Sequence, residues 1–256
     1  MKPVAFRYER PESVEEAVAL LAEHGEEAKV LAGGQSLVPM LNMRLARPSV
    51  LVDVNRLPLG EVALENGSWR VGALVRQADR QLLEIPLLAE CLPHVGHFVT
   101  RNRGTVGGSI AHADAAAELP LALTALGGSV VTSAGRTVPA EEFFVTHFTT
   151  ALEPDELLVE TVWPAARPEY RYAFEEVAQR HGDFALCMAA AVAGPDGLRV
   201  VLGSVVDRPT LLAVDPERPG ESAAEQVEPW GNLHASADYL RHLVRVLVDR
   251  VAERVR

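Results

Sequence analysis

Cysteine and lysine are the scarcest chemically versatile residues in this sequence of 256 residues. It has two cysteines, Cys91 and Cys187, and two lysines, Lys2 and Lys29. Both cysteines stand in mostly apolar surroundings, which favours two buried, reduced thiols over a disulfide or a redox pair. Two thiols cannot ligate an iron-sulfur cluster of the common four-thiolate kind. Schiff-base chemistry and P-loop nucleotide binding each depend on a lysine, so a chain with only two lysines is a poor candidate for either.

Excess positive charge and long apolar runs are also missing. The 24 Lys and Arg residues stand against 35 Asp and Glu, a formal charge of −11, which argues against nucleic acid or an anionic membrane as a partner. The longest apolar stretches, 119–126 and 184–193, are shorter than the roughly 20 residues that span a bilayer. The eight histidines follow no metal-ligand spacing, so no metal site is predicted. The charged start of the chain does not look like a signal peptide, and we expect a cytoplasmic protein.

Periodicity and punctuation predict an α+β chain. The first helix is the clearest, because Ser13 and Glu16 form a capping-box pattern and Gly25 follows the apolar face. Further helices are expected at 37–46, 77–91, 115–126 and 237–251. Strands are expected at 29–33, 49–55, 157–162 and 198–206, with hairpins around Asn66-Gly67 and within 129–144, while 174–193 mixes strand and helix signals.

A proline-rich stretch at 164–170 is the best candidate for a domain boundary. We therefore predict a larger first domain at 1–168, built from lobes of about 1–58 and 59–168. A smaller domain at 169–256 follows. No internal repeat is present.

Two strand-glycine-glycine turns carry the clearest chemical signal. In 31–36 and again in 105–109, paired glycines are followed by a small hydroxyl residue and then by apolar sequence. Glycine pairs let backbone N–H groups converge into an anion-binding nest, aided by a helix N-terminus. Two nests in one domain could hold both phosphates of a dinucleotide. The spacing is not GxGxxG, which excludes a Rossmann fingerprint. Each pair taken alone is better explained by a tight turn, and only the two together make a phosphate site an equal alternative.

Longer strings around these turns resemble a known family. LAGGQSLVPMLNMRLARPSVLVDVNRLP at 31–58 and RNRGTVGGSIAHADAAAELP at 101–120 are similar to the two FAD-pyrophosphate segments of the flavoprotein medium subunit of molybdenum hydroxylases. That family includes the carbon monoxide dehydrogenase and xanthine dehydrogenase types. The similarity continues in order through 152–164, 175–193 and 230–250, so it covers nearly the whole chain.

The resemblance implies a two-lobed FAD-binding fold of the vanillyl-alcohol oxidase type, completed by a small α+β C-terminal domain. Within it, no side chain needs to act as a catalytic acid or base. The cofactor contacts implied are Ala32, Gly33, Gly34, Gln35, Ser36, Thr105, Gly107, Gly108, Ser109, Asp114, Glu118 and Leu158.

Several of these positions have alternative interpretations. Glu118 matches a family carboxylate that holds the cofactor, while Asp114 is equally well explained as a charge complementing a helix that begins near Ala115. Leu158 could pack near the flavin or adenine, or be an ordinary core leucine. His112 is interpreted as structural. Arg180 and Asp183 match a charged stretch near the isoalloxazine ring, and a structural salt bridge explains them equally well.

Two departures from the family pattern stand out. Ala115 occupies a position where the family usually has proline, a change that should leave the nest intact. The stretch at 194–230 looks shorter than the family's C-terminal domain and has few landmarks.

The function that the resemblance implies is an FAD-carrying electron-transfer subunit of a molybdenum hydroxylase, with a carbon monoxide dehydrogenase medium subunit as one example. Molybdenum cofactor and iron-sulfur clusters would lie on a large and a small partner subunit of a heterotrimer that dimerises. The alternatives are a free-standing FAD-dependent oxidase or reductase and a nucleotide-binding scaffold without redox function. The first needs a polar substrate pocket, and reversible reduction of bound FAD would count against the second.

Overall fold

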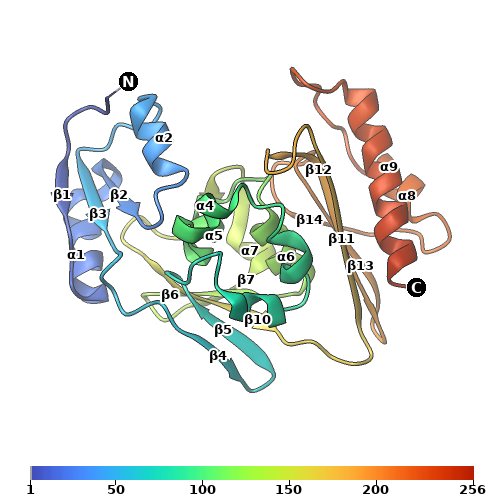
Figure 1. The fold of residues 1–256 in the computed structure, drawn as a ribbon, viewed down its shortest axis with the longest axis horizontal. Helices are drawn as coiled ribbons and strands as arrows, with labels where there is room; N and C mark the ends of the chain where they lie inside the picture. The colour runs from blue at the N-terminus through green and yellow to red at the C-terminus, as the bar shows by residue number, and fades with distance from the viewer. Residues whose placement is uncertain (1) are drawn as a thin grey trace.

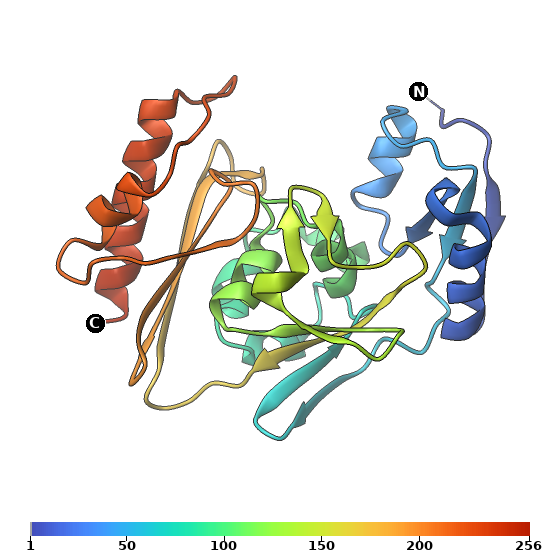
Figure 2. The ribbon, with the colours of Figure 1, turned by 180° about the vertical axis from the view of Figure 1, so that it is seen from behind.

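Three main β-sheets follow one another along the chain, with the second lobe between the first lobe and the C-terminal domain (Figure 1, Figure 2). The computed structural model describes residues 2–256. The first lobe has a parallel sheet in the order β1-β3-β2. Its elements are β1 (Arg7–Glu9), α1 (Val14–His24), η1 (Gly25–Glu27), β2 (Ala28–Leu31), α2 (Leu37–Asn42) and β3 (Val50–Asp53).

Helix α1 begins and ends where its sequence signals stand. The Ser13 hydroxyl accepts a hydrogen bond from the Glu16 backbone N–H at 3.1 Å, and Gly25 ends the helix with a φ of +50°. The Glu16 carboxylate reaches the N–H of Glu12, one residue before the position that a capping box would use. Ala17 and Leu21 bury the inner face of α1 in a core shared with β3 and with Leu74 and Leu157 of the second lobe.

The second lobe is built on a five-stranded antiparallel sheet in the order β4-β5-β10-β6-β7, with short helices on one face (Figure 1). Asn66 and Gly67 both have positive φ, as a tight hairpin turn between β4 and β5 requires. The strands are β4 (Val62–Glu65), β5 (Ser68–Gly72), β6 (Ser129–Thr132), β7 (Thr137–Pro139), β10 (Leu158–Pro164) and the separate pair β8 (Phe144–Thr146) and β9 (Thr149–Thr150). The helices are η2 (Arg80–Glu84), α3 (Leu88–Cys91), α4 (Phe98–Arg103), α5 (Val106–His112), α6 (Glu118–Ala125) and α7 (Ala140–Phe143).

Three helix predictions need correction. The expected helix 77–91 is a 3-10 turn, η2, followed by the single-turn α3, because Pro86 cannot donate a helical hydrogen bond and Leu87 has a φ of +65°. The expected helix 115–126 begins only at Glu118, after a loop that follows the left-handed Ala113. The expected helix 37–46 ends at Asn42.

The C-terminal domain explains the mixed signals in 174–193. Its antiparallel sheet runs in the order β11-β12-β13-β14, and β12 is buried on both faces. Cys187 and Ala189 face the core under α9, whereas Met188 and Ala190 face the core of the second lobe. A strand covered on both faces has a continuous apolar run instead of an alternation. The elements are β11 (Arg171–Ala178), β12 (Ala185–Gly194), β13 (Gly197–Gly203), β14 (Thr210–Leu212), α8 (Pro219–Glu225) and α9 (Ala237–Arg254).

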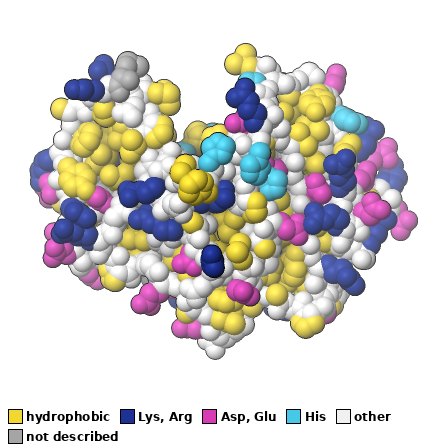
Figure 3. Space-filling model, in the orientation of Figure 1, with side chains coloured by type: hydrophobic (Ala, Val, Ile, Leu, Met, Phe, Trp, Pro, Cys, Tyr) yellow, Lys and Arg dark blue, Asp and Glu magenta, His cyan; other side chains and the backbone are white. Residues whose placement is uncertain are grey.

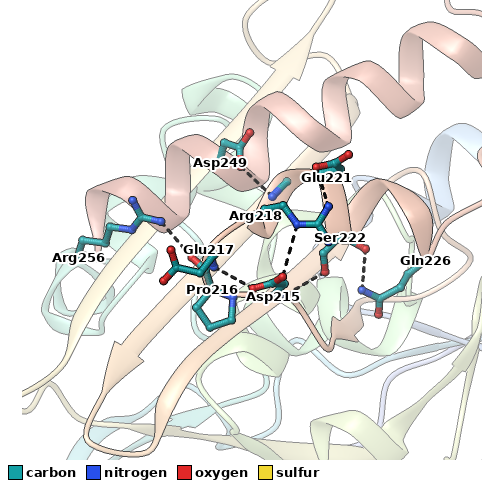
Figure 4. Close-up of polar contacts among 10 residues, drawn as sticks. Asp215, Pro216, Glu217, Arg218, Glu221, Ser222, Gln226, Asp249 and Arg256 are labelled. Atoms are coloured by element: carbon teal, nitrogen blue, oxygen red, sulfur yellow. Dashed lines mark hydrogen bonds and ion pairs between the residues drawn. The ribbon is translucent and has the colours of Figure 1, made fainter.

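Polar contacts hold the landmark-poor stretch 194–230 against α9 (Figure 4). The Gly220 N–H at the start of α8 donates to Asp249 Oδ1 at 2.8 Å, and the Arg256 guanidinium donates to the Pro216 carbonyl at 3.1 Å. Arg218 forms ion pairs with Asp215 and Glu221. These contacts are partly exposed and order the segment, so they do not make a binding site.

Both cysteines are free and buried, which confirms the prediction of reduced, buried thiols. Burial raises the pKa of the Cys187 thiol to about 12, and burial followed by nearby carboxylates raises the pKa of Cys91. Neither thiol is therefore reactive at neutral pH. Within residues 2–256, no helix is long and apolar enough to cross a membrane, and no cluster of three or more His, Cys, Asp or Glu is arranged around a metal position.

Candidate cofactor site

The two glycine segments meet at the boundary between the two lobes. The first segment, Ala32–Ser36, connects β2 to α2, and the second, Thr105–Ser109, forms the cap and first turn of α5. A Cβ added to Gly33 would collide with the backbone carbonyl oxygen of Arg103, and one added to Gly108 would lie 3.8 Å from the Cβ of Ala32. Only glycine allows this approach at position 33. The fold thus brings together two segments that are about 70 residues apart.

The first segment leaves its backbone donors free. The N–H groups of Gly33, Gly34, Gln35 and Ser36 have no acceptor within residues 2–256. The Ser36 hydroxyl makes no capping bond to α2, and Gly34 takes a φ of +72°. Because these residues are at least partly exposed and carry no negative charge, their N–H groups are suited to an anion.

The second segment differs from the expected loop of free donors. The N–H of Val106 donates to the Val75 carbonyl at 2.9 Å, that of Gly107 donates to Ala73 at 3.0 Å, and that of Gly108 donates to the Thr105 hydroxyl at 3.0 Å. A Cβ on Gly107 would lie 2.6 Å from Ala73. What this segment leaves open is the Ser109 hydroxyl, which has no hydrogen bond within residues 2–256.

Sequence reasoning missed two polar residues beside these segments. Asn55 follows β3 and donates from Nδ2 to the Ala32 carbonyl at 2.8 Å. Arg76 donates from Nη1 to the Arg103 carbonyl at 2.5 Å and from Nη2 to Asn55 Oδ1 at 2.9 Å. A signal for Asn55 was present, because β2 and β3 are parallel and the carboxyl ends of parallel strands meet at one edge of a sheet.

The two carboxyl groups after the second segment have different surroundings. Asp114 Oδ1 accepts from the Ala116 N–H at 2.9 Å and so shapes the loop before α6, which corrects the interpretation of a charge at a helix start near Ala115. Glu118 is the first residue of α6 and is 6% exposed. Burial raises its pKa to about 8, with Glu176 and Asp114 adding to the effect and Arg101 opposing it. A pKa of about 8 favours the protonated carboxyl at pH 7, and a protonated carboxyl can donate as well as accept a hydrogen bond.

A second acidic group lies across the domain boundary. The Glu176 carboxylate is buried on β11 and contacts His94 Nδ1 at 2.9 Å, and the His94 ring lies 5.9 Å from that of His181. Burial raises the pKa of Glu176 while His94 opposes the shift. Figure 3 shows a hollow between the first lobe and the C-terminal domain, with histidine side chains along it.

The remaining predicted residues lie outside the two glycine segments. His112 is half-buried and stacks on Phe148 with 4.8 Å between ring centroids, and burial lowers its pKa, which agrees with a structural role. Leu158 is 4% exposed in the core of the second lobe. Arg180 and Asp183 lie on an exposed turn between β11 and β12 and form no salt bridge within residues 2–256, so that interpretation is wrong.

The fold and the paired segments together define a two-lobed protein whose boundary between the lobes suits a dinucleotide cofactor. The family described as "FAD binding domain in molybdopterin dehydrogenase" matches residues 4–166, and the chain belongs to this family. The predicted resemblance and the predicted fold class are thereby confirmed.

Named relatives extend the match over the whole chain. The carbon monoxide dehydrogenase medium chain of Hydrogenophaga pseudoflava is 34% identical over 98% of this chain and 96% of its own. The alpha subunit of the 6-hydroxypseudooxynicotine dehydrogenase complex of Paenarthrobacter nicotinovorans is 38% identical over 98% of this chain and 94% of its own. A carbon monoxide dehydrogenase structure from H. pseudoflava superimposes with a TM-score of 0.93 at 32% identity, covering 100% of this chain and 98% of the other.

FAD fits the residues that are present. The free N–H groups of the first segment suit a phosphate, and Gly33 packs so closely on the backbone of Arg103 that any side chain would clash there. The Ser36 and Ser109 hydroxyls add two further polar groups without internal partners within residues 2–256.

Proposed function

We propose that this chain is the FAD-carrying electron-transfer subunit of a molybdenum hydroxylase complex. The observation that carries the proposal is the meeting of the two glycine segments, one with four free backbone donors, at the boundary between the lobes. Bound FAD supplies a redox centre that exchanges electrons one or two at a time. The chain itself binds and orients that centre.

Different residues bind different parts of the cofactor or support the loops that do so. The N–H groups of Gly33, Gly34, Gln35 and Ser36 hold the pyrophosphate, and the Ser109 hydroxyl adds a donor from the second lobe. Glu118 supplies a carboxyl group for a hydroxyl or carbonyl of the cofactor. Asp114 supports the loop between α5 and α6. Leu158 contributes apolar packing from the core of the second lobe.

The partners and location follow from the same chemistry. Two buried thiols leave this chain without ligands for an iron-sulfur cluster, so electrons reach FAD from clusters on a small subunit, after substrate oxidation at molybdenum on a large one. The heterotrimer dimerises and lies in the cytoplasm, where free thiols remain reduced. Relatives named for carbon monoxide, caffeine and 6-hydroxypseudooxynicotine support assigning substrate choice to the large subunit.

The test is the visible absorption spectrum of the tagged chain, recovered under mild conditions from its native cells. We expect flavin bands together with iron-sulfur absorption, because partner subunits accompany the chain. Flavin bands from a homogeneous, catalytically active single chain would replace the proposal with a free-standing flavoenzyme. A folded, fully assembled protein without flavin bands would overturn the FAD assignment.

A further inference from the structure

A set of hydrogen bonds crosses the lobe boundary next to the glycine segments. Arg76 donates to the Arg103 carbonyl at 2.5 Å and to Asn55 Oδ1 at 2.9 Å, and Asn55 donates to the Ala32 carbonyl at 2.8 Å. Ala32 opens the first segment, and Arg103 lies two residues before the second. One pair of side chains therefore holds a backbone group at each segment.

The first-lobe half of this bridge is anchored by a buried carboxylate. Asp53 is 7% exposed, and its Oδ1 accepts from the backbone N–H of Asn55 at 2.9 Å and from Asn55 Nδ2 at 2.6 Å. Its Oδ2 accepts from the Tyr8 hydroxyl. Burial acts to raise the pKa of Asp53, but the hydrogen bonds from Tyr8 and Asn55 hold it below its usual value. The charged carboxylate attracts the amide N–H₂ of Asn55, which leaves the amide oxygen for Arg76.

The second-lobe half is anchored by backbone pairing. Arg76 and Thr105 face each other in an isolated antiparallel bridge. On either side, the Gln77 N–H donates to the Gly104 carbonyl at 3.0 Å and the Val106 N–H donates to Val75 at 2.9 Å. Position 76 is thus fixed relative to the second glycine segment.

The bonds of Arg76 differ from those of the ion-paired arginines in the same lobe. Arg70 binds Glu160 and Arg136 binds Glu156, whereas both acceptors of Arg76 are neutral and no ion pair is found for it within residues 2–256. A planar guanidinium with donors in a fixed fork is well suited to set the distance between two acceptors.

We propose that Asn55 and Arg76 are positioning residues that hold the two glycine segments at the separation at which both reach the cofactor's pyrophosphate. This inference rests on the proposed function. The apolar contacts of Leu57, Leu74 and Leu157 and the packing of Gly33 on Arg103 remain without the bridge, so the lobes still associate. What is lost is preorganisation, and binding must then supply the free energy that fixes the segments.

The experiment measures dissociation constants for the full chain by calorimetry, with three probes. FAD carries both the pyrophosphate and the flavin. ADP carries adenosine and the pyrophosphate without the flavin, and riboflavin carries the flavin ring system without phosphate. The variants are Arg76→Met, Asn55→Ala, their combination and the conservative Arg76→Lys. Arg70→Met is the matched control, because it removes another partly exposed, hydrogen-bonded arginine, which lies on β5.

We expect each single variant to bind FAD and ADP about tenfold or more weakly, with the two losses equal and riboflavin unaffected. The double variant should bind FAD and ADP no more than about threefold more weakly than the single variant with the lower affinity, because both residues act through one bridge. Arg76→Lys should recover part of the affinity, and Arg70→Met should match the unchanged chain. Melting temperatures without ligand should stay close to that of the unchanged chain, which a purely structural role would not allow.

Retention of FAD and ADP affinity in Asn55→Ala would overturn the inference, even if Arg76→Met bound weakly, since that pattern would mean direct attraction of phosphate by the Arg76 charge. If Arg76→Met fails to fold, Asn55→Ala and Arg76→Lys decide by the same criterion. Failure of the proposed function has a different signature, because the unchanged chain would then bind neither FAD nor ADP.

Discussion

The two glycine segments both contain a glycine pair and a serine, but their backbone N–H groups differ in hydrogen bonding. In AGGQS at 32–36 the four N–H groups after Ala32 are free within the described chain, 2–256. In TVGGS at 105–109 the N–H groups of 106–108 are bonded to the carbonyls of Val75 and Ala73 and to the Thr105 hydroxyl. The first segment thus has donors available for a ligand, and the second is the capped start of a helix held against the turn that follows β5. A glycine pair followed by a small hydroxyl residue predicts that another group approaches the backbone closely. The surrounding structure decides whether that group is a ligand or another part of the protein.

The largest expected effect follows from Gly33→Val. The new side chain would meet the backbone of Arg103 and Gly104, which cannot move aside without separating the segments. We expect FAD affinity to fall at least about a hundredfold. Gly60→Val is the control, since no atom lies within 4 Å of a Cβ at that position and its φ is not positive. Full FAD occupancy in Gly33→Val, measured by flavin absorbance after gel filtration, would contradict the site.

The buried acid that follows the second segment, Glu118, makes the stability of the fold depend on pH. Its pKa is raised to about 8 in the fold, so the folded chain holds a proton that the unfolded chain releases. This stabilising contribution is fully present below about pH 4.5 and is lost as the pH rises towards 8, at up to about 1.4 kcal/mol per pH unit. Glu118→Gln should remove that slope. The free energy of unfolding of the variant minus that of the unchanged chain should therefore be a few kcal/mol larger at pH 8 than at pH 4.5.

Urea unfolding of the ligand-free chain between about pH 4.5 and 8.5 measures this difference. The exposed Glu84 provides the control, because Glu84→Gln should leave the pH profile unchanged. Parallel profiles for Glu118→Gln and the unchanged chain would mean that Glu118 is ionised in the fold.

Gly107→Val tests whether the second glycine segment packs against the protein and contributes to its stability. A Cβ there lies 2.6 Å from Ala73, and overpacking of this kind typically costs about 1–3 kcal/mol. We expect the loss in the free energy of unfolding without FAD, from denaturant titration. An unchanged free energy of unfolding would show that the start of α5 is free to move away from β5.

The smallest effect compares two hydroxyl residues. Thr105 caps α5 through the Gly108 N–H, and Ser36 makes no such bond to α2. Thr105→Ala should therefore cost about 1 kcal/mol of stability. Ser36→Ala should leave the unfolding midpoint unchanged and weaken FAD binding only. Equal destabilisation by both substitutions would contradict the assigned roles.

Local sequence signals such as helix caps and turn residues predict much of the fold. They do not predict contacts between residues that are far apart in the sequence. Helix 14–24 and the Asn66-Gly67 hairpin follow from caps and turn residues that act within a few positions. The prediction of a helix at 77–91 is wrong because Pro86 and Leu87 interrupt an apolar pattern that otherwise has helical spacing. The bridge between Asn55 and Arg76 spans two lobes, and no spacing rule brings such residues together.

The site shows the same division. The sequence predicts the cofactor at the glycine segments, because glycine pairs and a small hydroxyl residue are local features. Whether their N–H groups are free depends on Ala73 and Val75, which a one-dimensional pattern does not reveal. The pKa of Glu118 likewise depends on burial and on Glu176, a residue of the other domain.

The central claim is that the first segment binds the pyrophosphate with free backbone N–H groups, while the N–H groups of 106–108 in the second segment are already hydrogen-bonded within the protein. Amide hydrogen exchange of the full chain with and without FAD tests this most directly. We predict fast exchange at 33–36 that slows strongly on FAD binding, and little change at 106–108. Equal new protection in both segments, or none at 33–36, would contradict the account.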